Sequence, residues 1–213
     1  MEIHKLAIGG IQTFNWNNTN TNSAIGKQEV NEAFLTVNGF DGDTVAATEF
    51  HGGPDRAVCL YPLEHYSVWE AEFGVKIKTP GFGENISLFG MTEEEVYIGD
   101  TFQFGEAVIQ ITQGRIPCSK ISKFNQIDGL LKRVVETGFT GYFFRVLQEG
   151  KVERNSELKL LTKSEHAISV LYANQIYFHD RSNKQAIEKI LKVDELATVW
   201  RKLLIELLAK GNK

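Results

Sequence analysis

The sequence predicts a mainly β domain with interspersed helices over residues 1–161, followed by a small all-α C-terminal module over residues 162–213. Two observations carry this prediction. Short segments with strand-like alternation, separated by turn dipeptides rich in glycine, asparagine and aspartate, fill most of the first part. Beyond Leu161 the apolar residues recur at helical spacing. A length of 213 residues suits one domain with such an appendage.

The composition limits the classes of function. Hydrophobic residues make up 42% of the chain and aromatic residues 11%, which is enough for a folded core. The 23 basic and 27 acidic side chains give a net charge of −4, so neither nucleic acid nor an anionic membrane is an expected partner. The first ten residues lack the features of a secretory signal, and no run of about 18 apolar residues occurs. A cytoplasmic location is therefore expected.

The β elements are expected in the following order. Asn15–Ser23 is a polar tract without periodicity, which predicts an exposed loop. Strands are then expected at residues 34–37, 56–61, 96–104 and 107–112. Residues 142–147 and 158–161 lie on either side of a Glu149-Gly150 turn, and we expect them to form a late hairpin.

Two helices are predicted between these strands. The first begins at Pro62, a residue suited to the first turn of a helix, and ends at Gly74. The second has apolar residues at i, i+3, i+4, i+7 and i+8 counted from Ile127, and it ends near Gly138. Each helix presents one apolar side, so both are expected to pack over the sheet.

Three helices are predicted in the C-terminal module. Thr162 with Glu165, and Ser182 with Gln185, have the spacing of capping boxes for the first two helices. Asp194 is expected to cap the third helix, which has the strongest periodicity in the chain. Its apolar positions are Leu196, Val199, Trp200, Leu203, Leu204, Leu207 and Leu208.

A glycine-rich segment containing His51, Gly52, Gly53 and Arg56 is the first candidate binding site. Paired glycines let the backbone approach a ligand closely and expose N–H groups that bind anions. The alternative is a tight β-turn with a hydrogen-bonded histidine, and the segment by itself favours that alternative.

A second glycine-rich segment places Glu84 and Asn85 behind Gly81 and Gly83. A carboxylate and an amide together offer the donors and acceptors that a polar heterocycle needs. By itself, however, the segment is typical of an ordinary loop.

Cys118 is the strongest candidate for chemistry. It follows a predicted strand, with Arg115 three residues before it and Lys120 two residues after it. Neighbouring cations favour the thiolate, which can act as a nucleophile, a sulfur carrier or a ligand for a soft metal. The alternative is a buried thiol without a function. A hydrolase that pairs Cys118 with His51 stays a minor option.

Cys59 is predicted to lie in the core because it occupies an apolar strand. The five histidines are scattered and do not have the spacing of a zinc site, and the glycine motifs of nucleotide-binding folds are missing. Two cysteines cannot hold an iron–sulfur cluster of the four-thiolate kind.

Taken in order, these segments resemble the MOSC domain, the family named for the C-terminal module of molybdenum-cofactor sulfurases. The matching segments are Ser23-Ala24-Ile25 with Lys27, Gly42-Asp43, His51 to Val58, Tyr61-Pro62 with Trp69, Gly83-Glu84-Asn85, Gly99-Asp100, Arg115 with Pro117-Cys118, and Gly141-Tyr142. The tail after Leu161 is similar to the three-helix module of a stand-alone bacterial subgroup associated with resistance to N-hydroxylated base analogues. The resemblance covers nearly the whole chain.

The resemblance implies a β-barrel of the pyruvate-kinase-barrel type that binds the molybdenum cofactor (molybdopterin), with Cys118 as catalytic residue and metal ligand. The cofactor-binding residues it implies are His51, Gly52, Gly53, Arg56, Glu84, Asn85, Arg115 and Lys120. The chain departs from the subgroup at Val45 and Ala47, where Gln and Asp are usual, and around Asn155-Ser156, where a Gly-Asp turn is replaced. These departures concern substrate preference more than cofactor binding.

The implied function is a molybdenum-cofactor-dependent reductase of N-hydroxylated compounds such as 6-N-hydroxylaminopurine, which would detoxify base analogues. Electrons are expected from an external flavin- or ferredoxin-type reductase, because the chain has neither cluster cysteines nor a flavin motif. The helical tail could dock this donor, although a structural cap on the barrel is the simpler interpretation. Two alternatives stay open: a sulfur carrier or transferase with a persulfide on Cys118, and a non-catalytic cofactor-binding protein.

Overall fold

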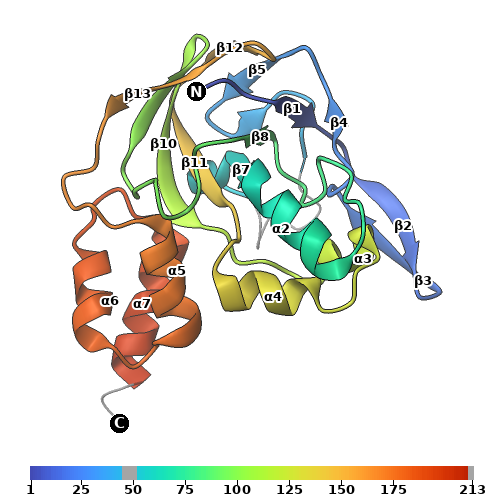
Figure 1. The fold of residues 1–213 in the computed structure, drawn as a ribbon. Coiled ribbons are helices and arrows are strands. Elements are labelled where there is room, and N and C mark those ends of the chain that lie inside the picture. Colours follow the sequence, from blue (N-terminus) through green and yellow to red (C-terminus); the bar gives the residue numbers. More distant parts are fainter. Residues whose placement is uncertain (45–51, 211–213) are drawn as a thin grey trace.

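The computed structural model describes residues 1–44 and 52–210. Its main element is a curved sheet of eight strands that forms a half-barrel (Figure 1). In spatial order the strands are β13 (Leu158–Thr162), β9 (Thr101–Phe104), β10 (Ala107–Gly114), β11 (Tyr142–Gln148), β7 (Val58–Pro62), β8 (Ile86–Leu88), β1 (Lys5–Ile8) and β4 (Gln28–Glu29). Strands β7 and β8 pair in parallel, and all other neighbours in this sheet pair antiparallel.

A smaller sheet packs against β10 and β11. Its strands are, in order, β12 (Gly150–Glu153), β5 (Glu32–Thr36) and β6 (Gly39–Phe40). The main hydrophobic core contains inward-pointing residues of both sheets, such as Ile109 and Ile111 of β10 and Leu35 of β5. The strands expected around residues 34–37, 56–61 and 107–112 are thereby confirmed. The strand expected at 96–104 begins only at Thr101, after the turn at Gly99 and Asp100.

The polar tract Asn15–Ser23 is not the exposed loop that we expected. It belongs to a two-stranded ribbon of β2 (Gln12–Trp16) and β3 (Thr19–Ser23). The turn residues Asn17 and Asn18 have φ values of 53° and 59°, as a type I′ hairpin turn requires. The hydrophobic alternation is weak here because the exposed face of the ribbon carries asparagine and threonine side chains that bond to each other across the strands.

The late hairpin is also a wrong prediction. Strand β11 pairs with β10 and β7, whereas β13 pairs with β9 at the edge of the main sheet. The turn at Glu149-Gly150 instead leads from β11 into β12, which pairs with β5. The pairing partners therefore lie far away in the sequence, where a local turn signal cannot identify them.

Both helices of the β domain are confirmed. They are α2 (Leu63–Phe73) and α4 (Leu130–Thr137), and each ends at a glycine with positive φ, 66° at Gly74 and 78° at Gly138. They pack over the sheet in a second hydrophobic cluster. A short helix that we had not predicted, α3 (Lys120–Asn125), follows Cys118.

The C-terminal module consists of α5 (Val170–His179), α6 (Lys184–Leu191) and α7 (Thr198–Lys210), as Figure 1 shows. The predicted caps are displaced. Ser169, not Thr162, accepts a hydrogen bond at the start of α5, and Asn183 does so for α6 instead of Ser182. Thr162 is the last residue of β13, so pairing with β9 takes precedence over a cap there. The predicted cap at Asp194 lies four residues before α7.

The helical module shares the main core of the β domain, since buried residues of α5, α6 and α7 belong to the same cluster as those of β10 and β11. Within the described residues, no helix is long and apolar enough to span a membrane. The same residues contain no group of three or more His, Cys, Asp or Glu side chains placed to hold a metal ion.

Candidate functional site

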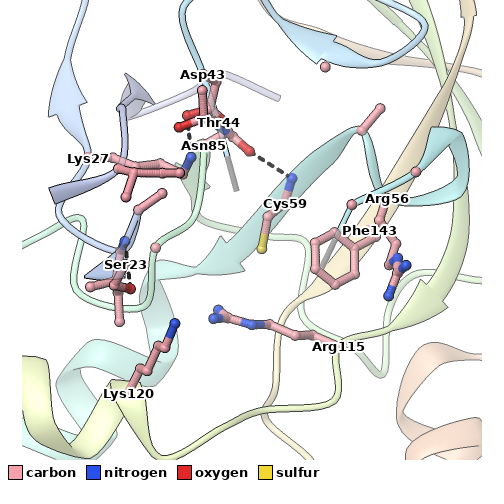
Figure 2. A pocket seen from close by; sticks show the side chains of 18 of the residues that line it. Ser23, Lys27, Asp43, Thr44, Arg56, Cys59, Asn85, Arg115, Lys120 and Phe143 are labelled. Atoms are coloured by element: carbon pink, nitrogen blue, oxygen red, sulfur yellow. Dashed lines mark hydrogen bonds and ion pairs between the residues drawn. The ribbon is translucent and has the colours of Figure 1, made fainter. Parts of the chain in front are cut away.

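A cavity of about 480 Å³ lies against one face of the half-barrel (Figure 2). Several distant parts of the chain line it: the segment 23–27 after β3, the loop that follows β6, residues 52–57, strands β7 and β11, and the segment 115–120. The fold thus brings together segments from the N-terminal 44 residues and from the middle of the chain. A second hollow of about 820 Å³, between Glu2 and Arg154, contains none of the expected site residues.

Both cysteines of the chain line this cavity. Cys118 lies in the loop between β10 and α3 and is half-buried. Cys59 lies on β7, directly opposite Phe143 of β11 in the antiparallel register, so both side chains are on the same face. Figure 2 shows the Cys59 sulfur pointing into the cavity. Cys59 is buried as expected, but it belongs to the cavity wall and to neither hydrophobic core cluster.

The two thiols differ in their surroundings. Burial raises the pKa of the Cys59 thiol to about 11, and the nearby charge of Arg115 opposes this only in part. Cys59 is therefore a neutral thiol at pH 7. Cys118 is more accessible and lies in the same loop as Arg115, three residues after it. Its accessible position suits a metal ligand better than the buried position of Cys59.

Cations dominate the charge of the cavity. Among the described lining residues, Lys27, Arg56, Arg115 and Lys120 are basic and only Asp43 is acidic. Arg115 is 9% exposed, and its guanidinium donates a hydrogen bond to the Phe82 carbonyl oxygen. No carboxylate of residues 1–44 or 52–210 forms an ion pair with it. A buried guanidinium with so few partners favours an anionic ligand.

Two other basic residues, Lys120 and Arg56, line the same cavity. The Lys120 ammonium donates to the carbonyl oxygen of Asn22 at 3.1 Å, which ties the start of α3 to the β2–β3 ribbon. Burial lowers the pKa of the Arg56 guanidinium, opposed by the charge of Asp55, but an arginine keeps its charge at any pH near neutrality. Both side chains therefore add positive charge on the cavity side.

Hydrogen bonds and an ion pair between buried side chains stabilise the opposite wall of the cavity. Asp43 forms an ion pair with Lys27 and accepts hydrogen bonds from the Gly9 amide at 2.8 Å and from the Asn85 side chain at 2.9 Å. Asn85 in turn accepts from the backbone N–H of Cys59 at 3.1 Å. Asp43 therefore pairs with Lys27, and the other basic lining residues among those described are Arg56, Arg115 and Lys120.

The structure brings together most of the expected site residues. Those that line the cavity are Gly52, Gly53, Arg56, Asn85, Arg115, Cys118 and Lys120. Glu84 is not among the lining residues. It is fully buried, where its carboxylate accepts hydrogen bonds from Tyr66, Ser87 and the Phe82 amide. His51 lies outside the described residues, as do Val45 and Ala47.

The lining residues that were missing from the expected site include Lys27, Asp43, Cys59 and Phe143. Lys27 and Asp43 had a sequence signal, because both belong to segments that resemble the MOSC pattern. Cys59 and Phe143 had none, since an apolar residue on a strand looks the same whether its face meets a core or a cavity.

Comparisons with known proteins show the family of the chain. The family profile of the MOSC domain matches residues 47–159, and that of the YiiM-like, 3-alpha helix domain matches residues 168–211. The protein YflK of Bacillus subtilis (strain 168) is 42% identical over 197 residues, which cover 92% of this chain and 89% of YflK. The chain belongs to the MOSC-domain family.

Other MOSC relatives cover both parts of the chain. Protein YiiM of Escherichia coli (strain K12) is 37% identical over 85% of this chain and 83% of its own length. The crystal structure of YiiM from Geobacillus stearothermophilus has a TM-score of 0.82 and 33% identity, covering 97% of this chain and 98% of that one. A protein of Gibberella moniliformis (strain M3125 / FGSC 7600) named "Reductase" is 32% identical over 82% of this chain, which is 30% of that protein.

The residues of the MOSC cavity fit a molybdenum–pterin cofactor. The Cys118 thiol provides a soft sulfur ligand, which suits molybdenum better than carboxylate or imidazole. Arg115, whose buried guanidinium has no acidic partner among the described residues, suits a phosphate group. A ligand that combines a soft metal with a phosphate therefore matches both kinds of donor.

Proposed function

We propose that this MOSC protein is a molybdenum-cofactor-dependent reductase of N-hydroxylated compounds, such as 6-N-hydroxylaminopurine. The observation that carries the proposal is a single cavity that is lined by a half-buried thiol, Cys118, and by the basic residues Arg56, Arg115 and Lys120. Among the described residues, the buried Arg115 guanidinium has no acidic partner. A relative at 32% identity that is named "Reductase" supports the reaction class.

Each group has a separate task in this proposal. Cys118 is the catalytic residue and holds the metal through its sulfur. Arg56, Arg115 and Lys120 hold the cofactor's phosphate, together with the backbone N–H groups of Gly52 and Gly53. Asn85, which bridges Asp43 and the Cys59 amide, fixes the opposite wall so that a substrate meets a rigid surface.

When bound, the cofactor would supply a redox-active metal for the two-electron, two-proton reduction of an N-hydroxyl group to the amine and water. The protein supplies binding, orientation and a positive electrostatic environment. The electrons come from a separate flavin- or ferredoxin-type reductase, because two cysteines cannot build a four-thiolate cluster in this chain. The cytoplasm is the compartment in which such a free-thiol protein stays reduced.

A turnover assay tests the proposal. The protein is expressed in a host that makes the molybdenum cofactor, and 6-N-hydroxylaminopurine is supplied with dithionite as reductant. We expect conversion to the amine by the wild type and none by Cys118→Ala, while circular dichroism shows that both are folded. Loaded wild-type protein that does not convert the substrate would instead support a non-catalytic cofactor-binding protein.

Mass spectrometry of Cys118 separates the remaining alternative. A persulfide on this residue, in protein that contains no molybdenum after expression in the same host, would contradict the reductase and favour a sulfur carrier. Our proposal predicts bound molybdenum and no persulfide on Cys118 in protein from this host.

A further inference from the structure

Phe143 is buried without belonging to the hydrophobic core. Its neighbours on β11, Tyr142 and Phe144, are fully buried and lie in the main core cluster. Phe143 is 8% exposed and belongs to neither hydrophobic cluster. Because side chains alternate along a strand, Phe143 points to the other face of β11, where it lines the cavity (Figure 2). Its ring is part of the cavity wall.

The ring of Phe143 has no aromatic partner among residues 1–44 and 52–210. Other buried rings of the protein do pair. Tyr61 stacks on Phe82 with 3.9 Å between ring centroids, and His65 stacks on Phe139 at 4.1 Å. Stacked rings stabilise each other beyond the effect of burial alone. The Phe143 ring therefore has no stacking partner within the described residues and can stack on the ring of a ligand in the cavity.

The cavity lining that contains Phe143 also contains small uncharged residues. Cys59, its direct partner in register, is a small neutral thiol, and Gly39 and Ala57 of the lining are small as well. Because these side chains are small, they occupy little of the cavity that Phe143 lines, which leaves room for a planar group. Arg56 and Arg115 line the same cavity and carry N–H groups that can donate to ring nitrogen or oxygen atoms.

We propose that Phe143, with Cys59 beside it, is a stacking platform for a planar nitrogen heterocycle. Two sources can supply such a ring, the N-hydroxylated base and the pterin of the cofactor. Whether the ring belongs to the substrate or to the cofactor rests on the proposed function. The stacking itself depends only on the cavity. Phe143 is a specificity-determining residue in this proposal and takes no part in the chemistry.

The stacking is tested with 2-aminopurine, a planar fluorescent base that is quenched when it stacks on an aromatic ring. The titration uses full-length protein from a host that lacks the molybdenum cofactor. We expect saturable quenching by the wild type, binding about ten-fold weaker for Phe143→Leu, and near wild-type binding for Phe143→Tyr. Phe34→Leu is the matched control, because Phe34 is 45% exposed on β5 and outside the cavity.

Equal 2-aminopurine dissociation constants for the wild type and Phe143→Leu would overturn the proposal, provided that thermal melting shows both proteins folded. An equal loss of affinity in Phe34→Leu would overturn it too, because the effect would then not belong to the cavity. Retained affinity in Phe143→Tyr together with loss of affinity in Phe143→Leu supports the proposal, because Tyr keeps the aromatic ring and Leu does not.

A second pair of measurements separates the two sources of the ring. In protein from a cofactor-producing host, a reduced pterin content of Phe143→Leu assigns the platform to the cofactor. Unchanged pterin content, with KM for 6-N-hydroxylaminopurine raised about ten-fold and kcat retained, assigns it to the substrate. If the wild type binds 2-aminopurine through Phe143 but takes up no molybdenum, the proposed function fails and the stacking platform stands.

Discussion

At the scale of single residues, two thiols line one cavity but differ in burial, since Cys59 is buried and Cys118 is half-buried. The flanking cations of Cys118 predicted a site that is open to a ligand, and the structure places Cys118 on the cavity. The strand position of Cys59 was predictable as well. Its exposure to a cavity was not predictable, because it depends on which segments enclose that face of β7, and these come from the first 44 residues and from the middle of the chain.

The raised pKa of Cys59 leads to a prediction about thiol reactivity. With a pKa of about 11, only about one Cys59 side chain in a thousand is a thiolate at pH 8. In cofactor-free protein, iodoacetamide should therefore label Cys118 well before Cys59. The rate at Cys59, followed in Cys118→Ala by mass spectrometry, should rise about ten-fold per pH unit up to about pH 10, because the thiolate is the reacting form. A Cys59 rate that is independent of pH would contradict this assignment.

At the scale of secondary-structure elements, the sequence predicted strands and helices better than their partners. Segments with apolar alternation or helical spacing were found nearly in place, because these patterns are local. The β2–β3 ribbon was missed because its stabilising cross-strand contacts are between asparagine and threonine side chains. The pairing of β13 with β9 was missed because it joins residues that are more than 50 positions apart, which no local pattern specifies.

The contact between β10 and α5 depends on a glycine. A Cβ atom at Gly114 would lie 2.0 Å from the side-chain oxygen of Asn174. Asn174 cannot easily move, since it is fully buried and its amide donates to Gly138 at 2.8 Å and to Thr140 at 2.9 Å. The helical module can therefore approach the sheet closely only at a residue without a side chain.

We expect Gly114→Ala to lower the free energy of unfolding by about 2 kcal/mol, as is typical of overpacking a buried contact. In a protein of this size, that corresponds to a decrease in Tm of about 4–8 °C. Gly10→Ala is the control, because a Cβ at Gly10 would meet no atom within 4 Å. Equal melting temperatures of the two variants in differential scanning calorimetry would show that the close approach is unimportant.

At the scale of the whole molecule, the helical module is linked directly to the cavity. Asp55 lies in the short 3-10 helix Pro54–Arg56, next to the lining residue Arg56. Its carboxylate forms an ion pair with Arg145 of β11 at 2.8 Å and accepts from the backbone N–H of Thr198 at 2.9 Å, at the start of α7. The module therefore helps to position the cavity segment in addition to covering the core.

Removing this link should affect the site more than the stability. For Asp55→Ala we expect a loss of about 1 kcal/mol or less, because the ion pair is partly exposed to solvent. The molybdenum content should nevertheless fall to roughly half or less, since groups behind the binding residues control their orientation. Asp41→Ala, a change at an exposed acidic residue, serves as the control. Full molybdenum content in Asp55→Ala would show that the module does not support the site.

The central claim is that Cys118, and not Cys59, completes a molybdenum centre in this cavity. The most direct test is the molybdenum content per protein, measured by mass spectrometry after expression in a cofactor-producing host, for the wild type, Cys118→Ala and Cys59→Ala. We predict bound metal in the wild type and in Cys59→Ala, and little or none in Cys118→Ala. Molybdenum that stays bound in folded Cys118→Ala, or disappears from folded Cys59→Ala, would contradict the claim.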